Sequence, residues 1–218
     1  TRSEQRKSLK GRERGGSADV DLNRGAHDAY ETQKASRSGY LEICLERVGS
    51  GVDYSAGGGR RKPTGSSRDQ TDLYELAQEA GYTVAKTHAE ADAIGTNTEK
   101  AIIIDEDLAD SDAMAYELDR TDDMWALADY VAKGIEVLDN DTGFFMMCEG
   151  GKIDWACHAN DAASSIHDTQ ALADAVQVAI DFAKEHADET LILVTGAHET
   201  GGLTIGFAGT DYDTYLDL

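Results

Sequence analysis

Three short apolar runs, each followed by polar residues, constrain the fold of this chain more than any other feature of its sequence. Residues 101–105 read AIIID, residues 143–149 read GFFMMCE and residues 189–196 read ETLILVTG. Continuous apolar runs of this length are typical of strands buried on both faces, because a half-exposed strand alternates apolar and polar residues. The sequence therefore predicts a largely parallel sheet with both of its faces covered.

Helical patterns separate these strands along the chain. Residues 72–82 are amphipathic and reach a glycine, residues 122–138 place apolar side chains near helical spacing, and residues 158–185 repeat one helical face throughout. Further short strands are expected within residues 52–60 and at residues 82–87. Strands and helices that alternate in this way predict an α/β domain of three layers, with helices on each side of the sheet.

Polar side chains follow all three apolar runs, and in a parallel sheet such strand ends meet at one edge. Asp105 follows the first run, Glu149 the second, and His198 comes shortly after the third. Asp154 and His158 lie four residues apart on a helical pattern, so their side chains share one helix face. Carboxylates and imidazoles ligate Zn²⁺, and carboxylates with water ligate Mg²⁺. All of these residues except Asp105 are candidate metal ligands, although a solvated surface pair also explains Asp154 and His158.

The charge balance restricts the partners of the chain. Its 218 residues include 42 Asp or Glu against 20 Lys or Arg, a net charge of −22. Such a chain repels nucleic acid and anionic lipid, so we expect neither as a partner. No apolar run is long enough to cross a membrane, and the basic N-terminus lacks the apolar core of a signal peptide. The acidic composition suits either high salt or an ordinary solvated surface.

Several stretches of the sequence resemble the alkaline phosphatase family. The stretch FFMMCEGGKIDWACHANDAASSIHDTQALADAV is similar to the metal-binding core of these enzymes, and LILVTGAHETGGLTIG is similar to the segment in which they show V-T-x-D-H. The resemblance extends to GVDYSAGGGR, DLYELAQEAGYTV and ASRSGYLEI, and it covers roughly residues 35–215. It implies an alkaline phosphatase-like α/β/α fold around a largely parallel central sheet.

The resemblance also implies a site with two zinc ions and one magnesium ion that hydrolyses phosphate monoesters. By position, Asp154 and His158 would ligate one zinc ion, His198 the other, and Glu149 the magnesium ion. Arg37 would hold the phosphate group of the substrate. The family likeness further implies a periplasmic or secreted protein, and assembly as a homodimer stays open.

The chain departs from the family pattern at several positions of this site. Ala197 stands beside His198, where the family has an aspartate that binds the second zinc ion. Ala26 stands where a threonine helps to bind magnesium, and no D-S-A segment precedes Arg37. No catalytic serine is therefore assigned within this chain, and no further histidine follows His198 to complete the zinc site.

Two hypotheses about function follow. The first is a metal-dependent phosphatase, in which residues 35–218 form an incomplete alkaline phosphatase-like domain and this chain alone turns over little substrate. The second is a non-catalytic fragment or relative that keeps the scaffold and partial metal binding. In both, residues 1–34 are a basic segment that matches the family poorly, and residues 1–24 are expected to be loosely attached.

Overall fold

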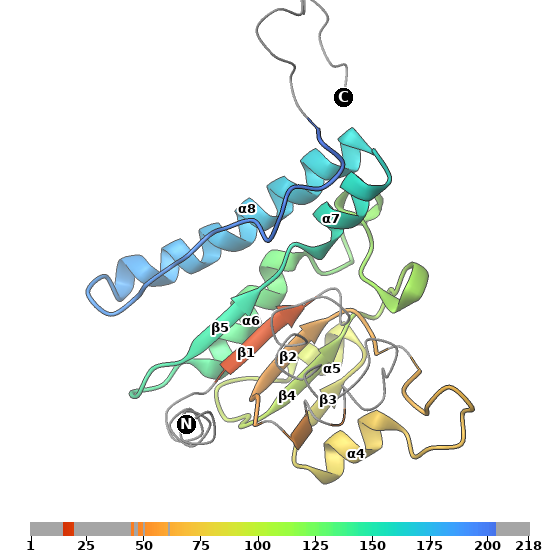
Figure 1. Cartoon of the computed structure of the whole chain (residues 1–218). Coiled ribbons are helices and arrows are strands. Elements are labelled where there is room, and N and C mark those ends of the chain that lie inside the picture. The colour runs from red at the N-terminus through yellow and green to blue at the C-terminus, as the bar shows by residue number, and fades with distance from the viewer. Residues whose placement is uncertain (1–14, 20–44, 46–47, 50, 61, 204–218) are drawn as a thin grey trace, which may run out of the picture.

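The computed structural model describes residues 15–19, 45, 48–49, 51–60 and 62–203 of the chain (Figure 1). These residues form a sheet with helices packed against it. The strands are β1 (Gly15–Asp19), β2 (Tyr54–Gly57), β3 (Thr83–Ala85), β4 (Ala101–Ile104) and β5 (Phe145–Cys148). The α-helices are α4 (Leu73–Glu79), α5 (His88–Asp92), α6 (Leu127–Leu138), α7 (Gly151–His158) and α8 (Ala162–Glu185), and two short 3-10 helices are η1 (Asp110–Asp112) and η2 (Glu117–Asp119).

The described strands form one five-stranded sheet in the order β3-β4-β2-β1-β5. Every neighbouring pair is parallel: β1 pairs with β2 and with β5, while β4 pairs with β2 and with β3. The carboxyl ends of these strands therefore lie at a common edge of the sheet. The prediction of a parallel sheet from the continuous apolar runs is confirmed.

Alternate residues of β4 pack into two separate clusters, so both faces of the sheet are covered. Ile103 packs with Tyr130 of α6 and with Ala91 of α5, whereas Ile102 packs with Ala77 of α4. Successive side chains of a strand point to opposite faces, which places α6 and α4 on opposite sides of the sheet. The three-layer α/β/α architecture expected from the sequence is confirmed.

β1 lies inside the sheet, between β2 and β5, although the sequence predicts a loosely attached segment for residues 1–24. The strand reads GGSAD and has none of the β-branched or aromatic residues that signal a strand. Its ladder pairs Gly16 with Tyr54 on one side and with Met146 on the other, and such pairing uses backbone groups alone. The expectation is wrong for these five residues, and the domain boundary at residue 35 stays a prediction.

The long helix predicted over residues 158–185 begins four residues later than expected, and His158 belongs to a separate short helix before it. α7 ends at that residue and α8 begins at Ala162. Between them Asn160 has a φ of 55°, a left-handed conformation that a right-handed helix does not continue through. Asp161 then caps α8, because its side chain accepts a hydrogen bond from the Ser164 backbone N–H at 3.1 Å. The two candidate ligands on this stretch therefore belong to the short α7.

Residues 189–196 form no strand, contrary to the expectation from their apolar run. Leu191, Leu193 and Val194 are 80%, 81% and 63% exposed. The course of the chain gives the reason: α8 has 24 residues, so its ends lie about 36 Å apart. The segment must return over that distance, in extended form, to bring Gly201 against α7 (Figure 1). Along this path the segment pairs with no strand among the described residues.

Candidate functional site

The turn from β5 into α7 places Glu149 at the carboxyl end of the sheet. β5 ends at Cys148, and Gly150 is the N-cap of α7. A Cβ atom at Gly150 would lie 3.0 Å from Ile153 Cδ1 and 3.2 Å from Leu172 Cδ2, so a side chain there would displace its neighbours. The glycine lets strand, turn and α8 pack closely, and Glu149 stands half-buried at this edge.

Asp154 and His158 meet on α7. His158 Nε2 lies 3.5 Å from Asp154 Oδ1, the approach expected of residues one helical turn apart. The Asp154 side chain is 24% exposed and that of His158 is 59% exposed. The carboxylate is therefore the inner group of this pair, and the imidazole reaches it from the solvent side.

His198 approaches the same carboxylate from the segment that follows α8. Its Nε2 atom lies 3.6 Å from Asp154 Oδ1, and Thr200 Oγ1 donates a hydrogen bond to that oxygen at 3.0 Å. Gly201 makes the approach possible: its φ is +73°, and a Cβ atom there would lie 2.3 Å from the Cys157 carbonyl oxygen. The HETGG stretch is thus fixed on α7 through a position that only glycine fits.

The hydrogen bonding of His198 indicates which ring nitrogen carries the proton and which one presents its lone pair to Asp154. Nδ1 lies 2.6 Å from the Glu199 carbonyl oxygen, and a carbonyl can only accept, so Nδ1 carries the proton of a neutral imidazole. The Nε2 lone pair then faces a carboxylate oxygen, which is also an acceptor. A cation between the two atoms satisfies both, and metal-bound histidines typically donate their other N–H to a carbonyl in this way. A doubly protonated ring would instead form an ion pair with Asp154.

The separations suit ligands of one ion, yet they do not amount to a closed metal site. Two ligand atoms on a tetrahedral zinc ion with bonds of about 2.0–2.1 Å lie about 3.3 Å apart. The Asp154 carboxylate oxygen lies 3.5 Å and 3.6 Å from the two imidazole nitrogens. In the described part of the chain, however, no group of three or more His, Cys, Asp or Glu side chains is arranged to hold an ion. Arg37 lies outside the described residues.

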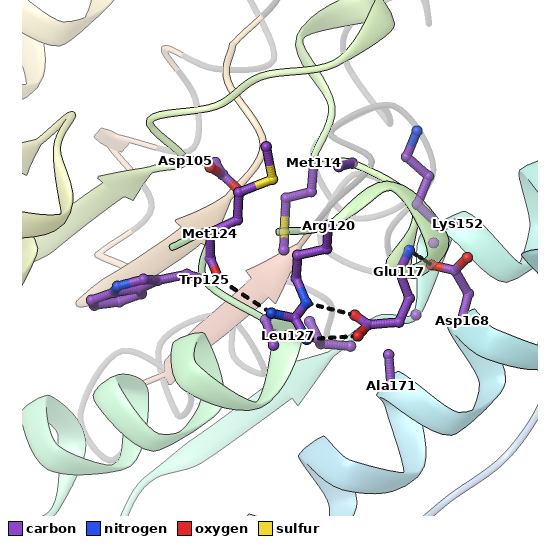
Figure 2. A pocket seen from close by; sticks show the side chains of 14 residues that line it. Asp105, Met114, Glu117, Arg120, Met124, Trp125, Leu127, Lys152, Asp168 and Ala171 are labelled. Atoms are coloured by element: carbon purple, nitrogen blue, oxygen red, sulfur yellow. Dashed lines mark hydrogen bonds and ion pairs between the residues drawn. The ribbon is translucent and has the colours of Figure 1, made fainter. Parts of the chain in front are cut away.

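A small cavity lies beside the Gly-Gly turn that precedes α7 (Figure 2). Its volume of about 30 Å³ gives room for one or two water molecules. Glu117 and Arg120 form a two-bonded ion pair at its rim, with N–O distances of 2.7 Å and 2.9 Å. Asp105, which the sequence places at the same sheet edge as Glu149, lines this cavity instead, and its burial raises the pKa of its carboxyl group.

Sequence reasoning missed two buried charged residues of this cavity. Lys152 is 5% exposed, and its Nζ atom lies 4.1 Å from the centre of the Tyr116 ring and 4.3 Å from that of Trp155. Asp168 is 7% exposed, and its Oδ1 atom accepts a hydrogen bond from the Glu117 backbone N–H at 3.4 Å. Burial raises the pKa of Asp168 to about 6, although the Glu117 N–H and the Lys152 charge oppose the shift.

The sequence holds one faint signal for these residues. Ser164, Asp168 and Ala175 are buried on α8, and their spacing of four and seven residues defines a helical face separate from the apolar stripe. This face is the buried one, whereas Thr169, Ala173 and Ile180 on the apolar stripe are exposed. The sequence does not indicate that the Asp168 carboxylate is buried, because a polar side chain on a helix is more often exposed.

The sequence matches one family model, described as Alkaline phosphatase, over residues 16–215. Among curated proteins, alkaline phosphatase 4 of Bacillus subtilis is 30% identical over 199 residues, which cover 88% of this chain and 41% of that protein. The repressible alkaline phosphatase of Saccharomyces cerevisiae is 31% identical over 151 residues, covering 64% of this chain and 26% of that protein. The chain thus spans less than half the length of these relatives.

Solved structures of alkaline phosphatases are also similar to this chain. A cold-active alkaline phosphatase from Shewanella sp. superposes with a TM-score of 0.68 at 26% identity, over 82% of this chain and 42% of that one. The alkaline phosphatase of the Antarctic bacterium TAB5 superposes with a TM-score of 0.68 at 26% identity, over 84% of this chain and 52% of that one. A variant of the TAB5 enzyme carries Mg in its M3 site.

Proposed function

Because this chain belongs to the alkaline phosphatase family, we propose that it contributes the metal-binding part of an enzyme that hydrolyses phosphate monoesters. One observation supports this most strongly: two histidine nitrogens from separate segments approach a single carboxylate oxygen, at 3.5 Å and 3.6 Å. Carboxylate and imidazole are the ligand types of catalytic zinc sites. The function proposed is metal-dependent phosphate ester hydrolysis.

Asp154 and His158 would hold one zinc ion, His198 would hold a second, and Glu149 would hold magnesium. Divalent cations bound to phosphoryl oxygens neutralise the negative charge that develops in the transition state of phosphoryl transfer. Thr200 holds Asp154 Oδ1 by a hydrogen bond of 3.0 Å, so that this carboxylate keeps one orientation. The Glu199 carbonyl oxygen, 2.6 Å from His198 Nδ1, fixes the imidazole with Nε2 facing Asp154.

Arg37 would bind the phosphate group of the substrate. A guanidinium group presents two parallel N–H donors that match two phosphate oxygens. In a chain of net charge −22, a dianionic substrate is repelled by the surrounding field. A positive group at the site, whether arginine or metal, is therefore needed to admit it.

Ala197 limits what this chain can do alone. Its methyl group offers no oxygen beside His198, and losing an anionic ligand weakens a zinc site severely. We therefore expect weak zinc binding at His198 and little turnover by the isolated chain. Replacing Ala197 with aspartate should raise zinc affinity, measured by calorimetric titration. An unchanged affinity would mean that the groups around His198 do not form a zinc site.

A non-catalytic relative that keeps the scaffold and part of the metal site is the second candidate. Two observations favour it: Ala197 itself, and the lack of a closed three-ligand cluster in the part of the chain that the structure describes. Such a protein would still bind one divalent cation at Asp154 and His158, and it would release no phosphate from esters at any metal concentration.

The setting of the proposed enzyme is periplasmic or secreted, as a monomer or homodimer. Among the described residues no helix has the length and apolar character needed to span a bilayer. The strongly acidic chain makes nucleic acid an unfavourable partner. Phosphate monoesters are the substrate class that fits the proposed ligand set.

The decisive experiment measures metal and activity on the same samples. The purified chain is loaded with Zn²⁺ and Mg²⁺, its metal content is counted by elemental analysis, and p-nitrophenyl phosphate hydrolysis is followed at alkaline pH with and without a chelator. Bound zinc that is lost in an Asp154→Ala variant supports the proposed site. Hydrolysis that the chelator abolishes supports the enzyme, and bound zinc without hydrolysis favours the non-catalytic relative.

A further inference from the structure

Helix α7 carries Asp154 and His158, and it is short, so its position depends on contacts with the rest of the fold. It has eight residues, and isolated helices shorter than about 12–15 residues are marginal in water. Its buried residues are Gly151, Lys152 and Ala156. Lys152 is the one long side chain of this helix that is fully buried, and it is a cation, whereas Ile153 and Trp155 are half-buried.

The ammonium group of Lys152 lies between two aromatic rings from different elements. Its Nζ atom is 4.1 Å from the ring centre of Tyr116, the N-cap of η2, and 4.3 Å from that of Trp155 on α7 itself. Both distances lie within the range of attraction between a cation and a π-face. The lysine thus ties α7 to the loop that begins η2.

Asp168 holds the neighbouring residue of the same loop from the other side. Its Oδ1 atom accepts a hydrogen bond from the Glu117 backbone N–H at 3.4 Å, while its Oδ2 atom is buried with no hydrogen-bond partner. A carboxylate buried with one unsatisfied oxygen costs stability. The fold keeps this group at a cost, so a role other than stability is indicated.

Tyr116 and Glu117 are consecutive, so Lys152 of α7 and Asp168 of α8 hold one short stretch of loop from two helices. The two charges also attract each other, since the Lys152 charge lowers the pKa of Asp168. Figure 2 shows Glu117, Lys152 and Asp168 gathered at one side of the cavity. Together they fix where α7 lies relative to α8.

We propose that Lys152 and Asp168 are positioning residues that set the affinity of the candidate metal site by clamping α7 to η2 and α8. The proposal rests on the proposed metal-binding function of Asp154, His158 and His198. Groups that orient metal ligands change metal affinity by roughly 10–100-fold when they are removed. Neither residue is expected to contact metal or substrate.

The test uses the full chain with Co²⁺ as a probe, because tetrahedral Co²⁺ gives a visible absorption band. Lys152→Met removes the charge and keeps the length of the side chain, Lys152→Arg keeps the charge, and Asp168→Ala removes the acceptor for the Glu117 N–H. Lys184→Met and Asp181→Ala are the matched controls, since these residues form an ion pair on α8 with side chains 66% and 61% exposed. Far-UV circular dichroism checks that each variant is folded.

We expect Lys152→Met and Asp168→Ala to bind Co²⁺ at least about tenfold more weakly, with Lys152→Arg close to the wild type and both controls unchanged. A folded Lys152→Met variant that binds Co²⁺ as tightly as the wild type would overturn the proposal. A loss of affinity that Lys152→Arg does not restore would also overturn it, because the charge would then not be the cause.

Amide hydrogen exchange tests the clamp on α7 independently of the proposed metal-binding function. In the metal-free chain, exchange over residues 151–158 should rise in Lys152→Met and Asp168→Ala but not in the two controls. If the wild type binds no Co²⁺ and exchange still rises, the proposed function fails while the clamp stands. If exchange over α7 does not change in either variant, the clamp itself is refuted.

Discussion

Replacing Asp168 with asparagine isolates the cost of burying one carboxylate in this fold. Burial raises the pKa of Asp168 from 3.8 to about 6, so the folded state binds the proton more tightly than the unfolded state. A shift of about two pKa units corresponds to up to about 3 kcal/mol between the protonated and ionised forms. Ionised Asp168 therefore destabilises the fold, and this penalty is complete above about pH 6. The penalty shrinks as the pH falls and is lost below the unfolded-state pKa of 3.8.

The charged groups that face Asp168 shape this pKa but do not cancel the effect of burial. Lys152 and His167 lower the pKa and Glu117 raises it, all less strongly than desolvation acts. These groups remain in the Asp168→Asn variant, so a comparison of the two proteins at each pH removes their own titration. Asparagine keeps an oxygen for the Glu117 N–H and carries no charge at any pH.

We expect the stability advantage of the variant over the wild type to be about 1–2 kcal/mol larger near pH 7.5 than near pH 4.5. The assay is urea unfolding followed by circular dichroism at both pH values, with Asp181→Asn as a control because Asp181 is exposed on the same helix. If the wild type and Asp168→Asn show the same change in unfolding free energy between the two pH values, the reasoning from a buried, raised-pKa carboxylate is wrong.

Three further changes test the geometry around Asp154. Gly201→Ala should weaken Zn²⁺ binding at least about tenfold with little loss of global stability, because its Cβ would lie 2.3 Å from a carbonyl oxygen of α7. Gly196→Ala is the control: its Cβ would lie 4.0 Å from the His198 carbonyl oxygen, an ordinary contact, so zinc affinity and stability in calorimetry should stay unchanged. Thr200→Val removes the 3.0 Å bond to Asp154 Oδ1 and should weaken Zn²⁺ binding several-fold in the same titration. Leu193→Ser should change the free energy of unfolding in urea by less than about 0.5 kcal/mol, since this leucine is 81% exposed; a loss of about 2 kcal/mol or more would mean that the segment is a buried strand.

Strand positions could be predicted from the sequence wherever a strand is buried among large side chains. The residues of β4, AIII, pack alternately into two clusters, and that burial is what a continuous apolar run records. β1 could not be predicted, because a ladder of backbone hydrogen bonds leaves no mark on a sequence such as GGSAD. At residues 191–194 the apolar run predicts a strand that the structure does not contain. Apolar side chains favour a buried strand, but they do not show that a neighbouring strand is available to pair with it.

The candidate site divides in the same way. Local spacing was enough to bring Asp154 and His158 together, because one helical turn fixes their separation. The likeness of the HETGG stretch to a known segment was enough to add His198. Lys152 and Asp168 were out of reach, because their importance comes from contacts between α7, η2 and α8 that no local pattern encodes.

The central claim is that Asp154 and His158 hold one divalent cation and that His198 belongs to a neighbouring metal position. A crystal of the chain grown with Zn²⁺, measured on both sides of the zinc absorption edge, tests it directly. The account predicts an anomalous difference peak about 2.0–2.2 Å from Asp154 Oδ1 and from His158 Nε2, with any second zinc ion at the same distance from His198 Nε2. Zinc bound only elsewhere, or these side chains ordered with no peak between them, would contradict it.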